Sequence, residues 1–199
     1  MSLSDLDLNA MLGSRICHDL ASPLSAIGNT MELIEMSGAP QTPELALIAD
    51  SIDHANARIR FFRIAFGHAA ADQETGRGEI AAVLTPVFKA RRIAVDWLPG
   101  GDIPRQEAKL TFLVLQCFDS AMPFGGQITV RRDGGRWAVI ATADRMREMP
   151  ELWGLLSDPA PGSDLKPADV HFVLAPITAQ AMGRNLHMTS NDGSVTVSF

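Results

Sequence analysis

The sequence predicts an α+β protein in which a helical segment precedes a mixed α/β segment. Up to about residue 70, apolar residues recur at helical spacing and none alternate with the period of a strand. Further on, alternating apolar residues at 127–132 and 136–142 flank the turn Asp133-Gly134-Gly135, which predicts a β-hairpin. The 199 residues allow one large domain or two small ones. The two patterns favour two domains, at 1–70 and 71–199.

The helical segment is expected to form two long helices joined by a short turn. The first covers 5–36 and the second runs from Thr42-Pro43-Glu44, an N-cap, a first-turn proline and a first-turn acid, to about residue 68. Residues 37–41 between them have turn chemistry. The resulting antiparallel hairpin has an apolar stripe that it cannot bury alone. A second copy would complete a four-helix bundle, so we expect a homodimer.

The second segment is expected to fold as helices and a mostly antiparallel sheet. The patterns predict helices at 80–91, 104–122 and 167–182, a weak helix at 149–156, and strands at 93–98, 127–132, 136–142, 185–189 and 194–199. A loop rich in proline and glycine precedes the last helix, and Asn191-Asp192-Gly193 joins the last two strands.

Charge and composition exclude several classes of function. The net charge of −6 argues against a nucleic-acid binder that relies on a basic surface and against a polybasic membrane anchor. No apolar run reaches the roughly 18 residues of a membrane-spanning helix, and the first ten residues contain no basic side chain of a targeting signal. The two cysteines are too few for a disulfide scaffold. We therefore expect a cytoplasmic protein without membrane or nucleic-acid partners.

The segment around His18 carries the clearest chemical signal. At about 100° per residue, His18 lies opposite the stripe of the first helix, which consists of Leu12, Ile16, Leu20, Pro23, Ile27 and Ile34. Its imidazole is thus expected to face solvent, and a neutral, exposed imidazole can accept a phosphoryl group. The Asp19 carboxylate can accept a hydrogen bond from one ring N–H, which leaves the other ring nitrogen as the nucleophile. Pro23 removes the hydrogen bond to the Asp19 carbonyl and is expected to bend the helix there.

These residues resemble the phosphoacceptor motif of dimeric sensor histidine kinases, and more closely the ChpT-type histidine phosphotransferases. The resemblance covers the whole chain. It is carried by Cys17-His18-Asp19-Leu20-x-Ser22-Pro23, by Arg60-Phe61-Phe62-Arg63-Ile64-Ala65-Phe66-Gly67 at the end of the second helix, and by Ala121-Met122-Pro123-x-Gly125-Gly126-x-Ile128.

The resemblance implies a phosphorelay protein that does not use ATP. His18 would accept a phosphoryl group from the receiver domain of a hybrid kinase and pass it to receiver domains of response regulators. The second domain would be a degenerate ATPase-like α/β sandwich. Aligned on Pro123-x-Gly125-Gly126, the two magnesium-binding asparagines of kinases fall on Leu113 and Cys117, and 141–146 lacks the expected glycines. No cofactor is expected on the chain itself, and Mg²⁺ would belong to the partner receiver.

Four further residues are candidates for contact with a phosphoryl group or a partner: Arg15, Ser22, Arg58 and Arg63. Each can also be an ordinary residue of the helix surface, which is the more usual role of such serines and arginines. The remaining histidines lack ligand spacing, and both cysteines are typical of small buried residues.

Other functions stay open at the level of sequence. The chain could be a diverged ATP-dependent sensor kinase, or a module that binds receivers without transferring phosphate. A metal phosphohydrolase would use His18-Asp19 and Asp53-His54 across the hairpin, but further metal ligands are missing from the sequence pattern.

Overall fold

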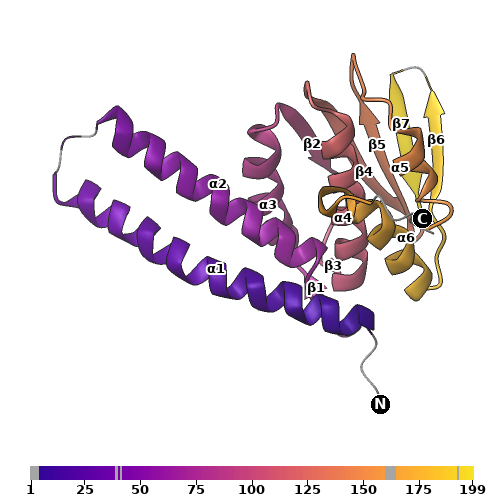
Figure 1. The fold of residues 1–199 in the computed structure, drawn as a ribbon, viewed down its shortest axis with the longest axis horizontal. Helices are drawn as coiled ribbons and strands as arrows, with labels where there is room; N and C mark the ends of the chain where they lie inside the picture. Colours follow the sequence, from indigo (N-terminus) through magenta and orange to yellow (C-terminus); the bar gives the residue numbers. More distant parts are fainter. Residues whose placement is uncertain (1–4, 39, 41, 160–164, 192) are drawn as a thin grey trace.

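The hairpin of two long helices is present as predicted. A computed structural model of the chain describes residues 5–38, 40, 42–159, 165–191 and 193–199. Helix α1 (Asp5–Met36) continues through Pro23, and α2 (Pro43–Ala65) returns beside it, so that the pair projects from the rest of the molecule (Figure 1). Helix α2 begins where the sequence predicts, because the Thr42 hydroxyl accepts the Leu45 N–H at 3.4 Å and Pro43 occupies the first turn.

The second segment contains a five-stranded sheet with the order β2-β4-β5-β7-β6. The strands are β2 (Ile93–Trp97), β4 (Gly126–Asp133), β5 (Arg136–Thr142), β6 (His187–Asn191) and β7 (Ser194–Ser198). Only β2 and β4 pair in parallel, so the prediction of a mostly antiparallel sheet is confirmed. A separate ladder of β1 (Glu74–Thr75) and β3 (Ile103–Pro104) was not predicted, because two-residue strands carry no periodicity.

Helices cover one face of this sheet. They are α3 (Arg77–Lys89), α4 (Arg105–Ala121), the short α5 (Pro150–Gly154) and α6 (His171–Ala181) (Figure 1). Helix α4 is buried along most of its length and forms the centre of the core. The helix predicted at 80–91 begins earlier, at Arg77, and the one predicted at 167–182 is divided into a 3₁₀ turn (Pro167–Asp169) and α6.

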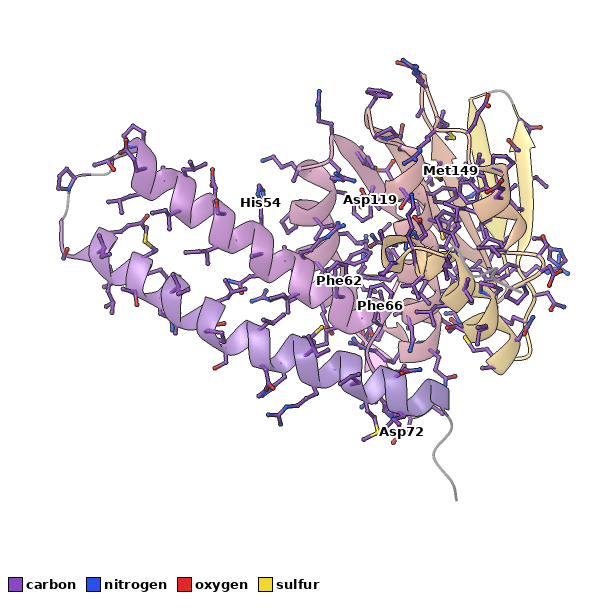
Figure 2. All side chains as sticks on the ribbon, in the orientation of Figure 1. His54, Phe62, Phe66, Asp72, Asp119 and Met149 are labelled. Atoms are coloured by element: carbon purple, nitrogen blue, oxygen red, sulfur yellow. The ribbon has the colours of Figure 1, made fainter. Side chains whose placement is uncertain are left out.

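The base of the hairpin belongs to the same core as the sheet. Ala57, Phe61, Ile64 and Ala65 of α2 are buried against α3 and α4. The ring of Phe61 lies 4.9 Å from that of Phe112 and 5.9 Å from that of Phe88. Figure 2 shows Phe62 and Phe66 at the same junction. The division into domains at residue 70 stays a prediction.

Several predicted features fall on residues that are not described. These are parts of the turns at 37–41 and 191–193 and of the proline- and glycine-rich loop, namely 39, 41, 160–164 and 192. Among the helices that are described, none is both long enough and apolar enough to cross a bilayer.

Candidate functional site

His18 stands on the exposed side of α1 with one ring nitrogen engaged. Its side chain is 79% exposed, and Nδ1 lies 3.2 Å from Oδ1 of Asp19. The other carboxylate oxygen of Asp19 accepts a hydrogen bond from Nε of Arg15 at 2.8 Å. When Nδ1 carries the ring proton and donates it to Asp19, Nε2 keeps a free lone pair directed away from this cluster. The imidazole is then prepared for nucleophilic attack through Nε2.

The buried residues of α1 lie on a different side of the helix from His18. Ala10, Cys17 and Met31 are buried, and Gly13 and Gly28 come close to Phe66 and Ile52. A Cβ on Gly13 would lie 3.1 Å from the backbone oxygen of Phe66, so the two backbones are nearly in contact there. His18 follows Cys17 by about 100° around the helix and therefore emerges at the edge of the interhelical seam.

The Asp19 carboxylate is kept ionised by its two neighbours. The hydrogen bond with His18, followed by that with Arg15, lowers the pKa of Asp19 below its ordinary value. Because a carboxylate accepts hydrogen bonds only, this charge fixes the direction of the bond from Nδ1–H. The same charge would stabilise the positive ring that forms when Nε2 is phosphorylated.

The other predicted contact residues, Ser22, Arg63 and Arg58, differ in their exposure and in their partners. Ser22 is exposed one turn after His18. Arg63 pairs with Glu79 of α3 at 3.6 Å and lies close enough to Cys17 to oppose the rise that burial causes in the pKa of that thiol. Arg58 is directed to the second segment, where Nη2 lies 3.2 Å from Oδ2 of buried Asp119.

The positions that correspond to magnesium ligands in kinases lie inside the core. Leu113 and Cys117 have no exposed surface. Nearby, the ring of Trp153 contacts those of Phe118 and Phe172, at 5.8 and 5.3 Å between centroids. A side chain without accessible surface cannot reach a nucleotide-bound ion unless the core opens.

The residues of the metal-hydrolase alternative do not come together. Figure 2 shows His54 on the side of α2 that faces away from α1, so Asp53-His54 does not meet His18-Asp19 across the hairpin. Within the described ranges, no group of three or more His, Cys, Asp or Glu side chains could hold a metal ion.

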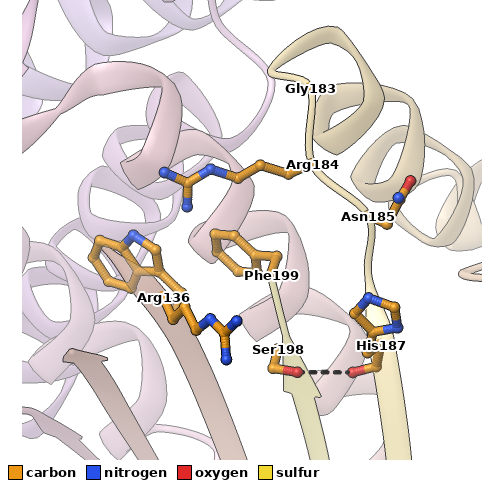
Figure 3. A pocket seen from close by; sticks show the side chains of 8 residues that line it. Arg136, Gly183, Arg184, Asn185, His187, Ser198 and Phe199 are labelled. Atoms are coloured by element: carbon orange, nitrogen blue, oxygen red, sulfur yellow. Dashed lines mark hydrogen bonds between the residues drawn. The ribbon is translucent and has the colours of Figure 1, made fainter. Parts of the chain in front are cut away.

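A polar cluster far from His18 was not predicted from the sequence. The Glu107 carboxylate, almost fully buried, accepts hydrogen bonds from Arg184 and from Nε1 of Trp137 at 3.0 Å, and pairs with Arg132 at 3.0 Å. Figure 3 shows Arg184 beside Phe199 at the wall of the adjoining pocket of about 560 Å³. These partners are 25 to 77 residues apart in the chain, so no local motif could reveal them.

The buried histidine of the second segment is also a structural group. His171 is almost inaccessible, and its Nε2 lies 3.2 Å from the hydroxyl of Ser120. Burial lowers the pKa of His171 to about 4. It is a hydrogen-bonded core residue.

The site thus consists of an exposed imidazole that a neighbouring carboxylate orients on a helical hairpin. Residues 77–194 match the family described as the histidine phosphotransferase C-terminal domain. The chain is 34% identical to protein phosphotransferase ChpT of Brucella abortus (strain 2308) over 204 residues, 96% of this chain and 95% of that protein. The solved structure of a bacterial phosphotransferase, 30% identical, superposes with a TM-score of 0.70 and covers all of this chain and 98% of that one.

The chain therefore belongs to the histidine phosphotransferase family. It is a phosphotransferase of a two-component phosphorelay.

Proposed function

We propose that His18 is the residue that carries the phosphoryl group, between receiver domains of a hybrid kinase and of response regulators. Nε2 attacks the phosphorus of a receiver aspartyl phosphate. The new N–P bond forms as the O–P bond breaks, and the receiver carboxylate leaves with the electron pair. Nδ1 keeps its proton, and the ring becomes a phosphoimidazolium that Asp19 stabilises. The reverse sequence passes the group to the next receiver.

The observation that carries this proposal is an accessible imidazole ring whose Nδ1 is hydrogen-bonded to Asp19. The 79% exposure of His18 lets a folded partner reach Nε2, and the 3.2 Å contact with Asp19 orients the ring. Arg15, which pairs with Asp19, and the exposed Ser22 and Arg63 would contact the partner or the phosphoryl oxygens. Arg58 would instead hold α2 on the second segment through Asp119. The chain would supply no cofactor, and Mg²⁺ would be held by the partner receiver.

The test is the transfer of labelled phosphate from a phosphorylated receiver domain to the full chain. Wild type is expected to become labelled and His18→Ala to stay unlabelled, whereas His54→Ala, exposed on α2, is the matched control and should behave as wild type. Asp19→Asn should slow the transfer by roughly 10- to 100-fold, because the ring loses its orienting acceptor. Label on His18→Ala at the wild-type level would contradict the proposal.

The burial of Leu113 and Cys117 supports a relay that does not consume ATP. Titration of the chain with Mg²⁺-ATP, followed calorimetrically, is expected to give no saturable heat. Tight binding together with labelling from ATP would favour the alternative of a diverged kinase.

We further propose that two chains pair into a four-helix bundle, which the apolar surface of α1 supports. Leu12, Ile16, Leu20 and Ile27 are about half exposed in the single chain and repeat on one face, apart from the face that contacts α2. A two-fold partner would cover this stripe and leave each His18 outside the bundle.

Light scattering measures this association directly. The wild-type mass should correspond to two chains, and Ile16→Glu should reduce it towards one chain because a charge would be buried in the interface. The control Ser25→Glu, placed on the opposite side of α1, should keep the wild-type mass. A monomeric wild type would refute the pairing.

A further inference from the structure

A carboxylate of the second segment lies between two arginines at the base of the hairpin. Oε1 of Glu79, in the first turn of α3, is 3.6 Å from Nη2 of Arg63 on α2 and 3.4 Å from Nη1 of Arg105 on α4. Nη1 of Arg105 also donates to the Thr75 hydroxyl at 3.1 Å. Arg105 is therefore fixed and mostly buried, whereas Arg63 is about half exposed and has Glu79 as its ion-pair partner.

The Arg63–Glu79 ion pair lies next to the polar face of α1, the face that carries His18. Arg63 and Arg105 line a pocket of about 380 Å³ together with Ser14, one helical turn before His18 on the same side of α1. The Ser14 hydroxyl accepts the His68 N–H at 2.9 Å, and a Cβ on Gly67 would lie 3.0 Å from that hydroxyl oxygen. Residue 67, just after the end of α2, thus faces residue 14 of α1.

The antiparallel pairing places Arg63 at the level of His18. Arg63, in the last turn of α2, comes four residues before Gly67, and His18 comes one turn after Ser14 along α1. The electrostatic influence of Arg63 on Cys17, the residue next to His18, agrees with this register. An arginine side chain that starts at this level can reach a group attached to His18.

The ion-paired groups of the cluster carry a net positive charge that a second anion can match. One carboxylate, Glu79, of charge −1 bridges two guanidinium groups of charge +2 in total, and the Glu74 carboxylate lines the same pocket. A phosphoryl group on histidine carries close to two negative charges and offers three acceptor oxygens. Guanidinium groups bind such oxygens more strongly than they bind an exposed carboxylate at 3.6 Å, a distance beyond a good hydrogen bond.

We propose that Arg63 exchanges Glu79 for the phosphoryl oxygens when His18 is phosphorylated, while Glu79 stays with Arg105. Glu79 then acts through Arg63, for which it competes with the phosphoryl group. The exchange links the occupancy of His18 to the first turn of α3, which belongs to the second segment. This inference rests on the proposed role of His18.

The experiment measures how strongly His18 retains phosphate in the full chain. Potassium phosphoramidate is the phosphoryl donor, and ³¹P NMR gives both the fraction of phosphohistidine at equilibrium and its chemical shift. Arg63→Gln should lower the equilibrium constant for phosphorylation roughly fivefold, because one charge-assisted contact is lost. Glu79→Gln should raise that constant by a similar factor, because Arg63 has no competing acid.

The double variant separates the exchange from general effects of charge. In the Arg63→Gln background, Glu79→Gln should change the equilibrium constant less than twofold, since Glu79 acts through Arg63. Arg63→Lys should restore part of the loss. The matched control Arg60→Gln, exposed on the same helix, should keep both the wild-type constant and the wild-type ³¹P shift. Circular dichroism confirms that each variant is folded.

The failure of the proposed function and the failure of the exchange give different results. If His18→Ala is phosphorylated as well as wild type, the proposed function fails. If His18 is phosphorylated but the effect of Glu79→Gln is the same with and without Arg63, the exchange is overturned and the role of His18 stands.

Discussion

The two ends of the helical hairpin differ in what covers them. At the base, Phe61 and Ile64 of α2 have almost no exposed surface and join the core formed by α3 and α4. At the outer end, Leu33, Met36 and Leu47 are mostly exposed in the single chain. The same two helices therefore pass from a packed core to an uncovered end within about 35 Å, the length of a 23-residue helix at 1.5 Å per residue.

This difference explains how the backbone around His18 is held in place while its side chain stays accessible. His18 lies nearer the base, where packing of α2 on the second segment sets its position, and it points out of the seam. The outer end contributes little to that position within one chain. The apolar stripe for which we propose a second copy as the partner runs along α1 from Leu12 to Ile27, between the two ends.

The largest expected effect is at the base. Phe61→Ala removes a ring that contacts Phe88 and Phe112, and should lower the free energy of unfolding by about 3–5 kcal/mol. Leu47→Ala, at the outer end of the same helix, should cost less than about 1 kcal/mol. Urea denaturation measures both, and equal losses would remove the distinction between the ends.

The next effect concerns the ion pairs at the base. The Asp119 carboxylate, almost fully buried, pairs with Arg58 at 3.2 Å and with Arg91 at 2.7 Å. Asp119→Asn leaves both guanidinium groups without this counter-charge and should cost about 2–3 kcal/mol. Asp53→Asn, exposed towards the outer end of α2, should be neutral within the error of the same urea experiment. An unchanged free energy of unfolding in Asp119→Asn would show that the ion pair between Arg58 and Asp119 does not stabilise the packing of the hairpin on the second segment.

The base should also lose stability in mild acid through His171. The pKa of His171 is about 4 in the folded chain and near 6.5 when unfolded, so the unfolded chain binds the proton first. Stability should therefore fall as pH drops from about 6.5 towards 4, by roughly 1–2 kcal/mol at pH 5. His171→Gln should remove this component, and His68→Gln should keep it. The same pH dependence in wild type and His171→Gln would contradict the assignment.

The smallest expected effect is at the outer end. Thr42→Ala deletes the hydroxyl that caps α2 and should lower the free energy of unfolding by about 1 kcal/mol. Thr42→Ser keeps a capping oxygen and should stay within a few tenths of a kcal/mol of wild type. If both variants lose the same amount, the cap does not contribute through its hydroxyl.

The local elements could be predicted from the sequence because each has a local cause. The Thr42-Pro43 start of α2, the turn between β4 and β5, and the exposure of His18 opposite the apolar stripe all follow from neighbouring residues. The apolar stripe of α1 stays about half exposed in the single chain, as expected of a face that the hairpin cannot bury alone. Gly13 and Gly28, which approach α2, lie on a different side of α1.

The long-range contacts could not be predicted, for a physical reason. Arg58 reads as a surface arginine on its helix, and its partner Asp119 is 61 residues away. Glu79 is visible in the sequence only as an acid in a first turn, and its place between Arg63 and Arg105 depends on how three helices meet. Such pairs are decided by tertiary packing and not by local pattern.

The central claim is that Nε2 of His18 carries the phosphoryl group while Asp19 holds Nδ1. NMR of the phosphorylated chain with ¹⁵N-labelled histidine identifies the nitrogen that is bonded to phosphorus. The account predicts a single phosphohistidine, at Nε2 of His18, with Nδ1 protonated. Phosphorus on Nδ1, or on a residue other than His18, would contradict it.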